Sequence, residues 1–284
     1  MADGIESQDA AALSINDGKL QRRLTLIALK TMSRFYKYNG PCVPISSRII
    51  VKKGVRVNLT EAATMAFVAA RTSIPVPRIH CAFTRRDVTY IVMERIRGQT
   101  LAHAWPSLPK ADVERILMQL RGMLDELRAL PAPGVAIQSC VGGSLYDFRI
   151  HRPDEPRFGP FASTRAFHEW LREGLGPEQK PRYVDDDEWD DIRNMIAMQD
   201  RECGAPVFTH GDLNPFNVIV REGNIVGIID WEFSGWLPRY WEYPSVWLGN
   251  KTRIGWQRMA ERFIDPWPDQ LQMESTRQKW WGDF

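Results

Sequence analysis

The feature that most constrains this chain is a set of acids and an amide placed just outside short apolar segments. Val218 to Val220 and Ile225 to Ile229 flank a four-residue turn, which predicts a β-hairpin. Asp212, Asn217 and Asp230 each stand beside a hydrophobic segment of this region. A carboxylate next to a buried strand is costly unless it meets a cation or a proton to be moved. We therefore expect these three residues to form a functional site.

The spacing of these residues fits phosphoryl transfer from a metal nucleotide. That reaction needs one carboxylate to orient the attacking hydroxyl and accept its proton, and a second carboxylate with an amide oxygen to hold Mg²⁺. The catalytic loop of protein kinases places four residues between its base and its metal-binding asparagine. Four residues also separate Asp212 from Asn217 in this chain.

The chain resembles the aminoglycoside phosphotransferase and choline kinase-like family, and within it the fungal phosphotransferase-like branch. Two segments carry the resemblance most specifically, HGDLNPFNVIV at 210–220 and GIIDWEFSGWLPRYWEY at 227–243. The resemblance covers most of the chain, and the further matching segments are Val51-Lys52 with Glu61, Thr72 to Pro77, Val92 to Leu101, Gly142 to Asp147, Gly159 to Phe161, and Phe167-His168.

The resemblance implies a role for each matching residue. Asp212 would be the catalytic base, and Asn217 and Asp230 would be the metal ligands. Lys52 would contact the α- and β-phosphates, with Glu61 as its orienting partner.

The same resemblance places the adenine at the hinge, where backbone groups of Glu94, Arg95 and Ile96 would receive it. Lys53 is a rival to Lys52, but neighbouring residues of a strand point to opposite faces, so only one of them can reach the nucleotide. The family lysine stands two residues before a glycine, and this pattern selects Lys52.

Several residues around the motif have more than one reading. We expect His210 to brace the loop rather than to act as a base, because the family's acid already moves the proton. Trp231 is expected in the core, whereas Glu232 could face a cationic substrate or form a structural ion pair. Packing is favoured over a cage for a quaternary amine for the aromatic residues Trp236, Tyr240, Trp241 and Tyr243.

The resemblance implies an α+β, bilobal protein-kinase-like fold, with a small mixed β lobe, a larger helical lobe and the active site in the cleft between them. We expect residues 1–18 to be disordered, 19–94 to form the first lobe, and 95–284 the second lobe with a substrate-side insert at 131–200. The local patterns agree: residues 48–54 and the pair 78–83 and 88–93 read as strands, and 20–36, 62–70, 113–127 and 163–173 as helices.

The segment from Tyr38 to Ser47 departs from the kinase pattern. It should cover the phosphates, yet it has one glycine, two prolines and no GxGxxG motif. Each proline removes a backbone donor, so we expect few amides there to hold a triphosphate.

Composition limits the class of partner and the compartment. With 37 Lys and Arg against 35 Asp and Glu, the chain lacks the basic excess of a nucleic-acid-binding protein. The acidic run from Asp185 to Asp191 reads as a helix start rather than a cation-binding rim. Apolar runs too short for a bilayer and no secretion signal favour a cytoplasmic protein without a membrane partner. We expect a monomer, because no heptad or edge-strand signal argues for an oligomer. The scattered residues Cys42, Cys81, Cys140 and Cys203 suggest reduced thiols.

The function favoured by the sequence is that of a small-molecule kinase, which moves the γ-phosphate of ATP to a substrate hydroxyl with ATP and Mg²⁺ as cofactors. The partner is a small molecule, which could be cationic. Two alternatives stay open: a kinase-like ligand-binding protein with weak or no catalysis, and another transferase reaction in the same cleft.

Overall fold

The computed structural model describes residues 12–38, 40–150 and 156–282. The chain divides into two compact units, Met1–Val113 with Phe216–Glu232 and Glu114–Pro215 with Phe233–Phe284. The segment Phe216–Glu232 therefore belongs to the first unit. The lobe boundaries expected from the sequence stay a prediction.

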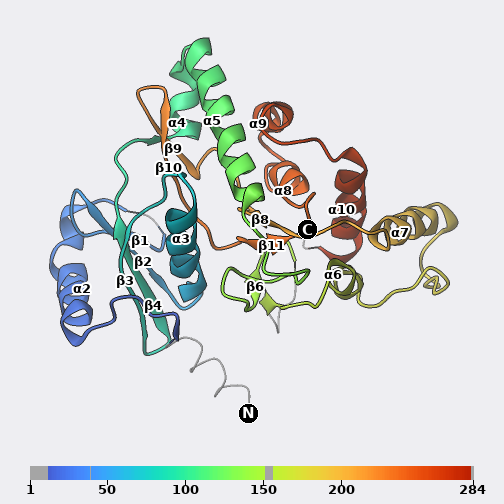
Figure 1. Ribbon diagram of the computed structural model, residues 1–284, viewed down its shortest axis with the longest axis horizontal. Helices are drawn as coiled ribbons and strands as arrows, with labels where there is room; N and C mark the ends of the chain where they lie inside the picture. Colours follow the sequence, from blue (N-terminus) through green and yellow to red (C-terminus); the bar gives the residue numbers. More distant parts are fainter. Residues whose placement is uncertain (1–11, 39, 151–155, 283–284) are drawn as a thin grey trace. The chain divides into compact units, whose positions relative to one another are not determined.

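The first unit is built on a four-stranded antiparallel sheet in the order β1-β2-β4-β3 (Figure 1). Its strands are β1 (Cys42–Pro44), β2 (Ile49–Gly54), β3 (Ile79–Arg85) and β4 (Val88–Glu94). The hairpin of β3 and β4 turns at Arg86 and Asp87, both with positive φ. The strands predicted at 48–54, 78–83 and 88–93 are confirmed.

Two helices flank this sheet, α2 (Lys19–Thr31) and α3 (Leu59–Arg71) (Figure 1). On α2, Ala28 and Leu29 pack against a cluster that includes Val51 and Phe83 of the sheet. The α3 helix begins at Asn58, whose side chain accepts a hydrogen bond from the Thr60 N–H at 2.9 Å. Both helices were predicted from the sequence, but the first was expected to continue to Tyr36 and ends at Thr31. A 3₁₀ turn, η1 (Ser33–Phe35), follows α2.

A second sheet of the first unit contains β9 (Val218–Arg221) and β10 (Asn224–Ile228), with β5 (Gln99–Thr100) on the far side of β9. The predicted hairpin is therefore confirmed. Gly98 permits the close approach of β5, because a Cβ atom there would lie 2.7 Å from the Val220 carbonyl oxygen. The short helix α4 (Leu101–Ala104) and the turn η2 (Trp105–Ser107) follow β5.

The second unit is mostly helical and contains two small antiparallel strand pairs. The strands are β6 (Leu145–Tyr146) with β7 (Arg157–Phe158), and β8 (Val207–Thr209) with β11 (Gly235–Leu237). The helices are α5 (Lys110–Ala129), which starts in the first unit, α6 (Thr164–Leu171), α7 (Asp186–Gln199), α8 (Glu242–Leu248), α9 (Ile254–Met259), η3 (Ala260–Arg262) and α10 (Pro268–Trp281).

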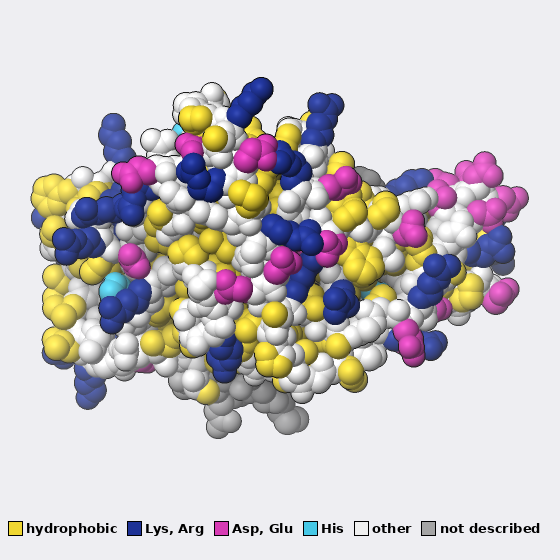
Figure 2. Space-filling view, turned by 45° about the horizontal axis from the view of Figure 1, so that its top comes forward, with side chains coloured by type: hydrophobic (Ala, Val, Ile, Leu, Met, Phe, Trp, Pro, Cys, Tyr) yellow, Lys and Arg dark blue, Asp and Glu magenta, His cyan; other side chains and the backbone are white. Residues whose placement is uncertain are grey.

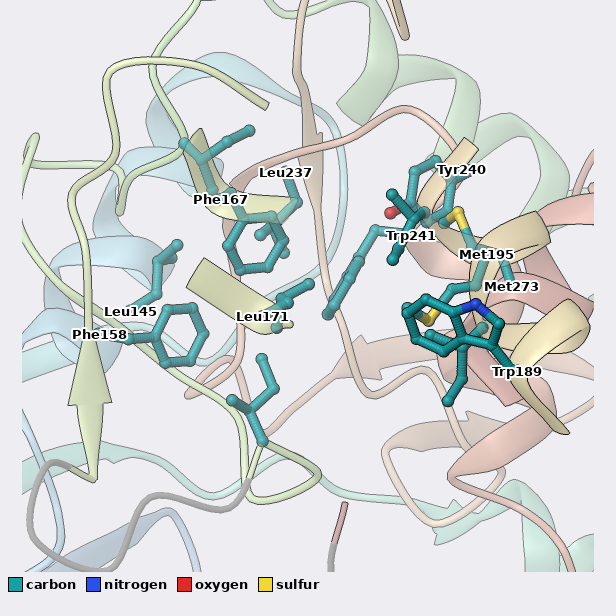
Figure 3. Close-up of a cluster of buried hydrophobic side chains, with 14 of the residues drawn as sticks. Leu145, Phe158, Phe167, Leu171, Trp189, Met195, Leu237, Tyr240, Trp241 and Met273 are labelled. Atoms are coloured by element: carbon teal, nitrogen blue, oxygen red, sulfur yellow. The ribbon is translucent and has the colours of Figure 1, made fainter. Parts of the chain in front are cut away.

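Aromatic and aliphatic side chains from many of these elements meet in one core (Figure 3). Trp236, Tyr240, Trp241 and Tyr243 are all buried, so the packing role expected for them is confirmed. Asp185 caps α7 by accepting from the Glu188 N–H at 2.8 Å, which confirms that the acidic run starts a helix.

Three further findings bear on the sequence expectations. Within the segment 1–18, residues 1–11 lie outside the described residues, whereas Ile15 forms an antiparallel bridge with Ala82 of β3. All four cysteines are free. Within the described part of the chain, no helix has both the length and the apolar character needed to span a membrane.

Candidate active site

Lys52 lies at the centre of an ion cluster in the first unit. Its Nζ atom lies 2.9 Å from Glu61 Oε2, 2.7 Å from Asp230 Oδ1 and 3.3 Å from Glu232 Oε2. Lys52 and Glu61 are buried, at 6% and 3% exposure, whereas the side chains of Asp230 and Glu232 are about one third exposed. The structure thus brings together Lys52, Glu61 and Asp230, which the sequence analysis singled out. Of the two readings of Glu232, the structure shows the ion pair.

Strand geometry explains why Lys52 and not Lys53 occupies this position. On β2, Val51 packs into the core that faces α2, so the next residue points to the opposite side, toward Glu61 on α3. The side chain of Lys53 points to the face of the sheet opposite to that of Lys52, and it is partly exposed. The choice of Lys52 over Lys53 therefore agrees with the register of the strand.

The cluster has three carboxyl groups and one ammonium group, and this environment shifts the pKa values of Glu61 and Lys52. Burial, only partly offset by Lys52, raises the pKa of Glu61 to about 7. Burial lowers the pKa of Lys52, but Glu61, Asp230 and Glu232 outweigh it and hold that pKa above its usual value. Lys52 is therefore charged, and a single ammonium faces three carboxyl groups.

The oxygens of this cluster fit a hard divalent cation. One carboxylate oxygen from each of Glu61, Asp230 and Glu232 lies within 4.8 Å of the others. Carboxylate oxygens are the ligands that Mg²⁺ uses in nucleotide sites. Because Asp230 and Glu232 are partly exposed, they are the members of the set that an ion can reach from solvent.

The backbone at Asp230 is in an unusual conformation. Its φ of 66° lies in the left-handed region, which is uncommon for a residue other than glycine. Such strain is found where a side chain must be aimed at a particular point, and here the carboxylate meets Lys52. Asn217, the other predicted metal ligand, is buried, and its carbonyl accepts from the Ile229 N–H at 2.9 Å, one residue before Asp230.

The predicted adenine contacts lie where β4 ends. The Glu94 and Arg95 amides donate to the carbonyls of Arg78 and Arg48, at 2.9 and 2.8 Å. Among the described residues, the Ile96 N–H makes no backbone hydrogen bond. Of the three predicted hinge amides, that of Ile96 is the one left to meet a ligand.

The tight turn between β1 and β2 uses most of its own amides. The Ile45 and Ser46 N–H groups donate to the Ile49 carbonyl, and the Arg48 and Ile49 N–H groups donate to Ser46 Oγ. This leaves Ser47 as the turn amide that makes no hydrogen bond within the described residues. The turn therefore has even fewer free N–H groups for a phosphate than its prolines led us to expect.

The predicted catalytic loop lies in the second unit. His210 is 1% exposed, and its Nδ1 accepts from the Asp212 N–H at 3.2 Å, so it braces the loop as expected. Gly211 has a φ of 83°, and a Cβ there would lie 2.7 Å from the Phe233 carbonyl oxygen, so only glycine fits. Asn214 Nδ2 donates to Asp212 Oδ2 at 3.0 Å, which orients the carboxylate of the predicted base.

Two charged residues that the sequence analysis did not single out, each with a side chain that is little exposed, form hydrogen bonds with this loop. Glu242 accepts the His210 N–H at 2.7 Å and the Gly211 N–H at 3.1 Å. Arg149 donates to the Gly211 carbonyl at 2.7 Å and is itself paired with Asp147. Burial lowers the pKa of Arg149, but the nearby carboxylates outweigh it, so the guanidinium stays charged.

A sequence signal for this loop clamp (Arg149, Asp147 and Glu242) exists in hindsight. Asp147 and Arg149 stand two residues apart in the irregular insert, where their spacing favours a charge pair held by a turn, and the Arg149 N–H does donate to Asp147 Oδ1 at 2.9 Å. Glu242 follows buried aromatic residues, where a lone acid needs partners.

Comparison with known proteins identifies the family of this chain. Residues 56–273 match the model of the phosphotransferase enzyme family known as APH. The chain is 27% identical over 208 residues to the clavilactone A biosynthesis cluster protein Y of Ampulloclitocybe clavipes, covering 63% of this chain and 50% of that protein. It is 35% identical over 120 residues to a subtelomeric hrmA-associated cluster protein of Aspergillus fumigatus, covering 38% and 22%. The chain thus spans half or less of the length of these curated relatives.

Solved structures show the same fold at low identity. A thermostable mutant of the aminoglycoside phosphotransferase APH(4)-Ia superposes with a TM-score of 0.58 at 16% identity, covering 84% of this chain and 79% of that one. The gentamicin complex of APH(2")-IIa gives a TM-score of 0.52 at 14% identity, covering 92% and 86%. These likenesses confirm the predicted α+β, protein-kinase-like fold. On its sequence and its fold, the chain belongs to the APH phosphotransferase enzyme family.

Proposed function

We propose that this protein is a small-molecule kinase that transfers the γ-phosphate of ATP to a hydroxyl group of its substrate. The observation that carries the proposal is the cluster in which buried Lys52 meets Glu61 and Asp230. A buried lysine held by a helix glutamate is the phosphate-contacting pair of kinase sites, and an acid beside it provides for the metal. Family membership and the nucleotide complex of APH(4)-Ia with ADP and hygromycin B support the same reaction class.

Each residue then has a physical task. Lys52 would neutralise charge on the α- and β-phosphates, and Glu61 would keep its ammonium in place. Asp212 would accept the proton of the attacking hydroxyl, with its carboxylate oriented by Asn214. The loop clamp would hold the Gly211 peptide, and with it the position of Asp212.

The metal set would consist of Asp230, with Asn217 as the resemblance implies and Glu232 as a further oxygen donor. A bound Mg²⁺ would supply positive charge to offset the charge on the phosphates. When they bind the ion, Asp230 and Glu232 would lose part of their interaction with Lys52. The Lys52 ammonium would then be available to contact the nucleotide.

The test is the formation of ADP in the presence of ATP, Mg²⁺ and a panel of hydroxyl compounds that includes amino sugars and amino alcohols. We expect ADP to form above background only with a true acceptor, and to be lost in Asp212→Asn. Nucleotide binding with no ADP formed from any acceptor would contradict turnover. No binding at millimolar nucleotide would contradict the kinase assignment as a whole.

The β1–β2 turn favours a second candidate, a kinase-like protein that binds a ligand without turnover. Four of the amides from Ile45 to Ile49 already donate within the turn, so the triphosphate would have few backbone donors there. A ligand that raises the melting temperature in the absence of nucleotide, together with a lack of ATP binding, would favour this candidate.

A further inference from the structure

Positive charge is concentrated in one stretch of this nearly neutral chain. Residues 19–60 hold ten of the 37 Lys and Arg residues and none of the 35 Asp and Glu residues. The rest of the chain therefore has 27 basic residues against 35 acidic ones. Lys52 is buried in the acid cluster, but most of the other basic residues of the stretch are exposed. This part of the surface favours an anionic partner.

The same stretch exposes a row of large apolar side chains, which we name the outer stripe. Along α2 the exposed fractions are 63% at Leu20, 56% at Leu24 and 58% at Ile27, and after the helix Met32 and Phe35 are 40% and 70% exposed. Leu20, Leu24 and Ile27 are spaced four and three residues apart, so they lie on one side of the helix. Single exposed apolar residues are ordinary, but a contiguous row marks an interaction surface.

Basic residues accompany this row. Lys19, Arg23 and Lys30 lie on α2, and Arg34 and Lys37 lie in the segment after it, and all five are exposed. The left edge of the space-filling view, the side on which Figure 1 draws α2, shows hydrophobic side chains among Lys and Arg side chains (Figure 2). A helix with an apolar row and Lys or Arg beside it matches the pattern of helices that lie in a membrane interface.

The packing of α2 narrows the choice of partner. Its inner face is occupied, because Ala28 and Leu29 pack on the sheet and Thr25 contacts Cys81. A protein groove would receive the helix by its apolar face, which involves the outer stripe alone, whereas the basic residues beside the stripe favour an anionic surface as well. A nucleic acid offers negative charge but no apolar phase for the outer stripe. A bilayer surface with anionic lipids offers both and adapts its shape to a convex helix.

We propose that α2 and the turn after it attach this protein to membrane surfaces that contain anionic lipids, with the outer stripe inserted among the acyl chains. The attachment is peripheral and needs no spanning helix. It departs from the expectation, drawn from overall composition, that the protein has no membrane partner. It does not depend on the proposed kinase reaction, because the outer stripe shares no residue with the site.

The test is co-sedimentation of the full chain with phosphatidylcholine vesicles, with and without phosphatidylserine. We expect binding to vesicles that contain phosphatidylserine, weakened by added salt. The double variant Leu24→Asp, Ile27→Asp should bind at least about tenfold more weakly, because two inserted side chains are lost. The matched control Met118→Asp, Ile254→Asp, at positions 68% and 58% exposed, should bind like the original protein.

Charge reversal separates the electrostatic attraction to anionic lipids from the insertion of the outer stripe. Arg23→Glu, Lys30→Glu should abolish the preference for phosphatidylserine, whereas Lys251→Glu, Arg258→Glu, at exposed positions elsewhere, should preserve it. All variants should keep the melting temperature, since the replaced side chains are exposed. No binding to either vesicle, or equal binding by the outer-stripe and control variants, would overturn the proposal. So would a dimer in light scattering that Leu24→Asp, Ile27→Asp converts to a monomer, because the occupant would then be a second copy.

Discussion

Lys52 in the first unit and Arg149 in the second each interact electrostatically with three carboxyl groups, but the surroundings of those carboxyl groups differ between the two sets. Around Lys52, Asp230 and Glu232 are 36% and 31% exposed. Around Arg149, Asp147 and Glu242 are 3% and 2% exposed, and both accept backbone N–H groups. The third carboxylate near Arg149 is that of Asp212.

The difference separates a site built to receive charge from one built to keep its shape. Buried carboxylates that accept N–H groups are stabilised within the fold, so the loop clamp needs no ligand. Partly exposed carboxylates gathered on one ammonium repel each other and gain when a cation arrives. We therefore expect substitutions in the Lys52 cluster to change binding, and substitutions in the loop clamp to change stability.

The largest expected effect is on turnover, at the acid that the loop clamp positions. Asp212→Asn keeps the shape of the side chain but cannot accept the substrate proton, so kcat should fall by about 10³-fold. Nucleotide affinity and melting temperature should change little. Asp190→Asn on the exposed face of α7 is the control and should retain full activity. Steady-state kinetics of both variants, once an acceptor is known, gives the result, and an active Asp212→Asn enzyme would refute the base assignment.

The next effect is on the affinity for the metal nucleotide. Asp230→Asn removes one charge from the Lys52 cluster and should weaken binding of Mg²⁺ with ATP by about tenfold or more. The free protein should be as stable as the original or more so, because carboxylate repulsion falls. Calorimetric titration and thermal melting of the same sample measure both quantities. A large loss of stability without loss of affinity would mean that the Lys52 cluster, like the loop clamp, serves to stabilise the fold, which would contradict the distinction between them.

A smaller effect, on stability, should follow from a change in the loop clamp. Glu242→Gln removes the charge that accepts the His210 and Gly211 N–H groups, so the free energy of unfolding should fall by about 2 kcal/mol. Urea denaturation measures this change. Glu114→Gln is the matched control, because its partner Arg262 is exposed and surface ion pairs contribute little. If both variants lose equal stability, the distinction between buried and exposed carboxylates is wrong.

The smallest effect is a pH dependence within the second unit. Burial lowers the pKa of His168 below 6.5, and its ring nitrogens bond the Gln199 carbonyl and the Tyr240 hydroxyl. The unfolded chain therefore binds a proton near pH 6.5 that the folded protein does not, and the free energy of unfolding should fall as pH drops below about 6.5. Urea unfolding between about pH 7.5 and 5.5 should show a shallower slope for His168→Gln than for the exposed control His103→Gln.

The local structure was predictable from the sequence wherever hydrophobic residues recur at a regular spacing or a capping residue marks the start of a helix. The β3–β4 and β9–β10 hairpins, the capped helices α3 and α6, and the choice of Lys52 all follow from alternation, turns or capping residues. The residues of the candidate site could also be singled out, because acids beside apolar strands are conspicuous. Their catalytic roles stay a prediction.

The loop clamp escaped prediction because it depends on contacts between distant segments. Arg149 meets Gly211 across 62 positions of the chain, and Glu242 meets His210 across 32. No local pattern encodes such pairs. The outer stripe shows the reverse case, since its period is visible in the sequence but only the structure reveals that this face of α2 points outward.

Calorimetric titration of ATP into the original protein and into Lys52→Met, with and without Mg²⁺, tests the central claim most directly. Methionine keeps the length of the side chain and removes its charge. We predict that the original protein binds ATP only with Mg²⁺, and that Lys52→Met, still folded by circular dichroism, loses this binding by at least about tenfold. Equal affinity of the two proteins for ATP, or no binding by the original protein at millimolar ATP with Mg²⁺, would contradict the account.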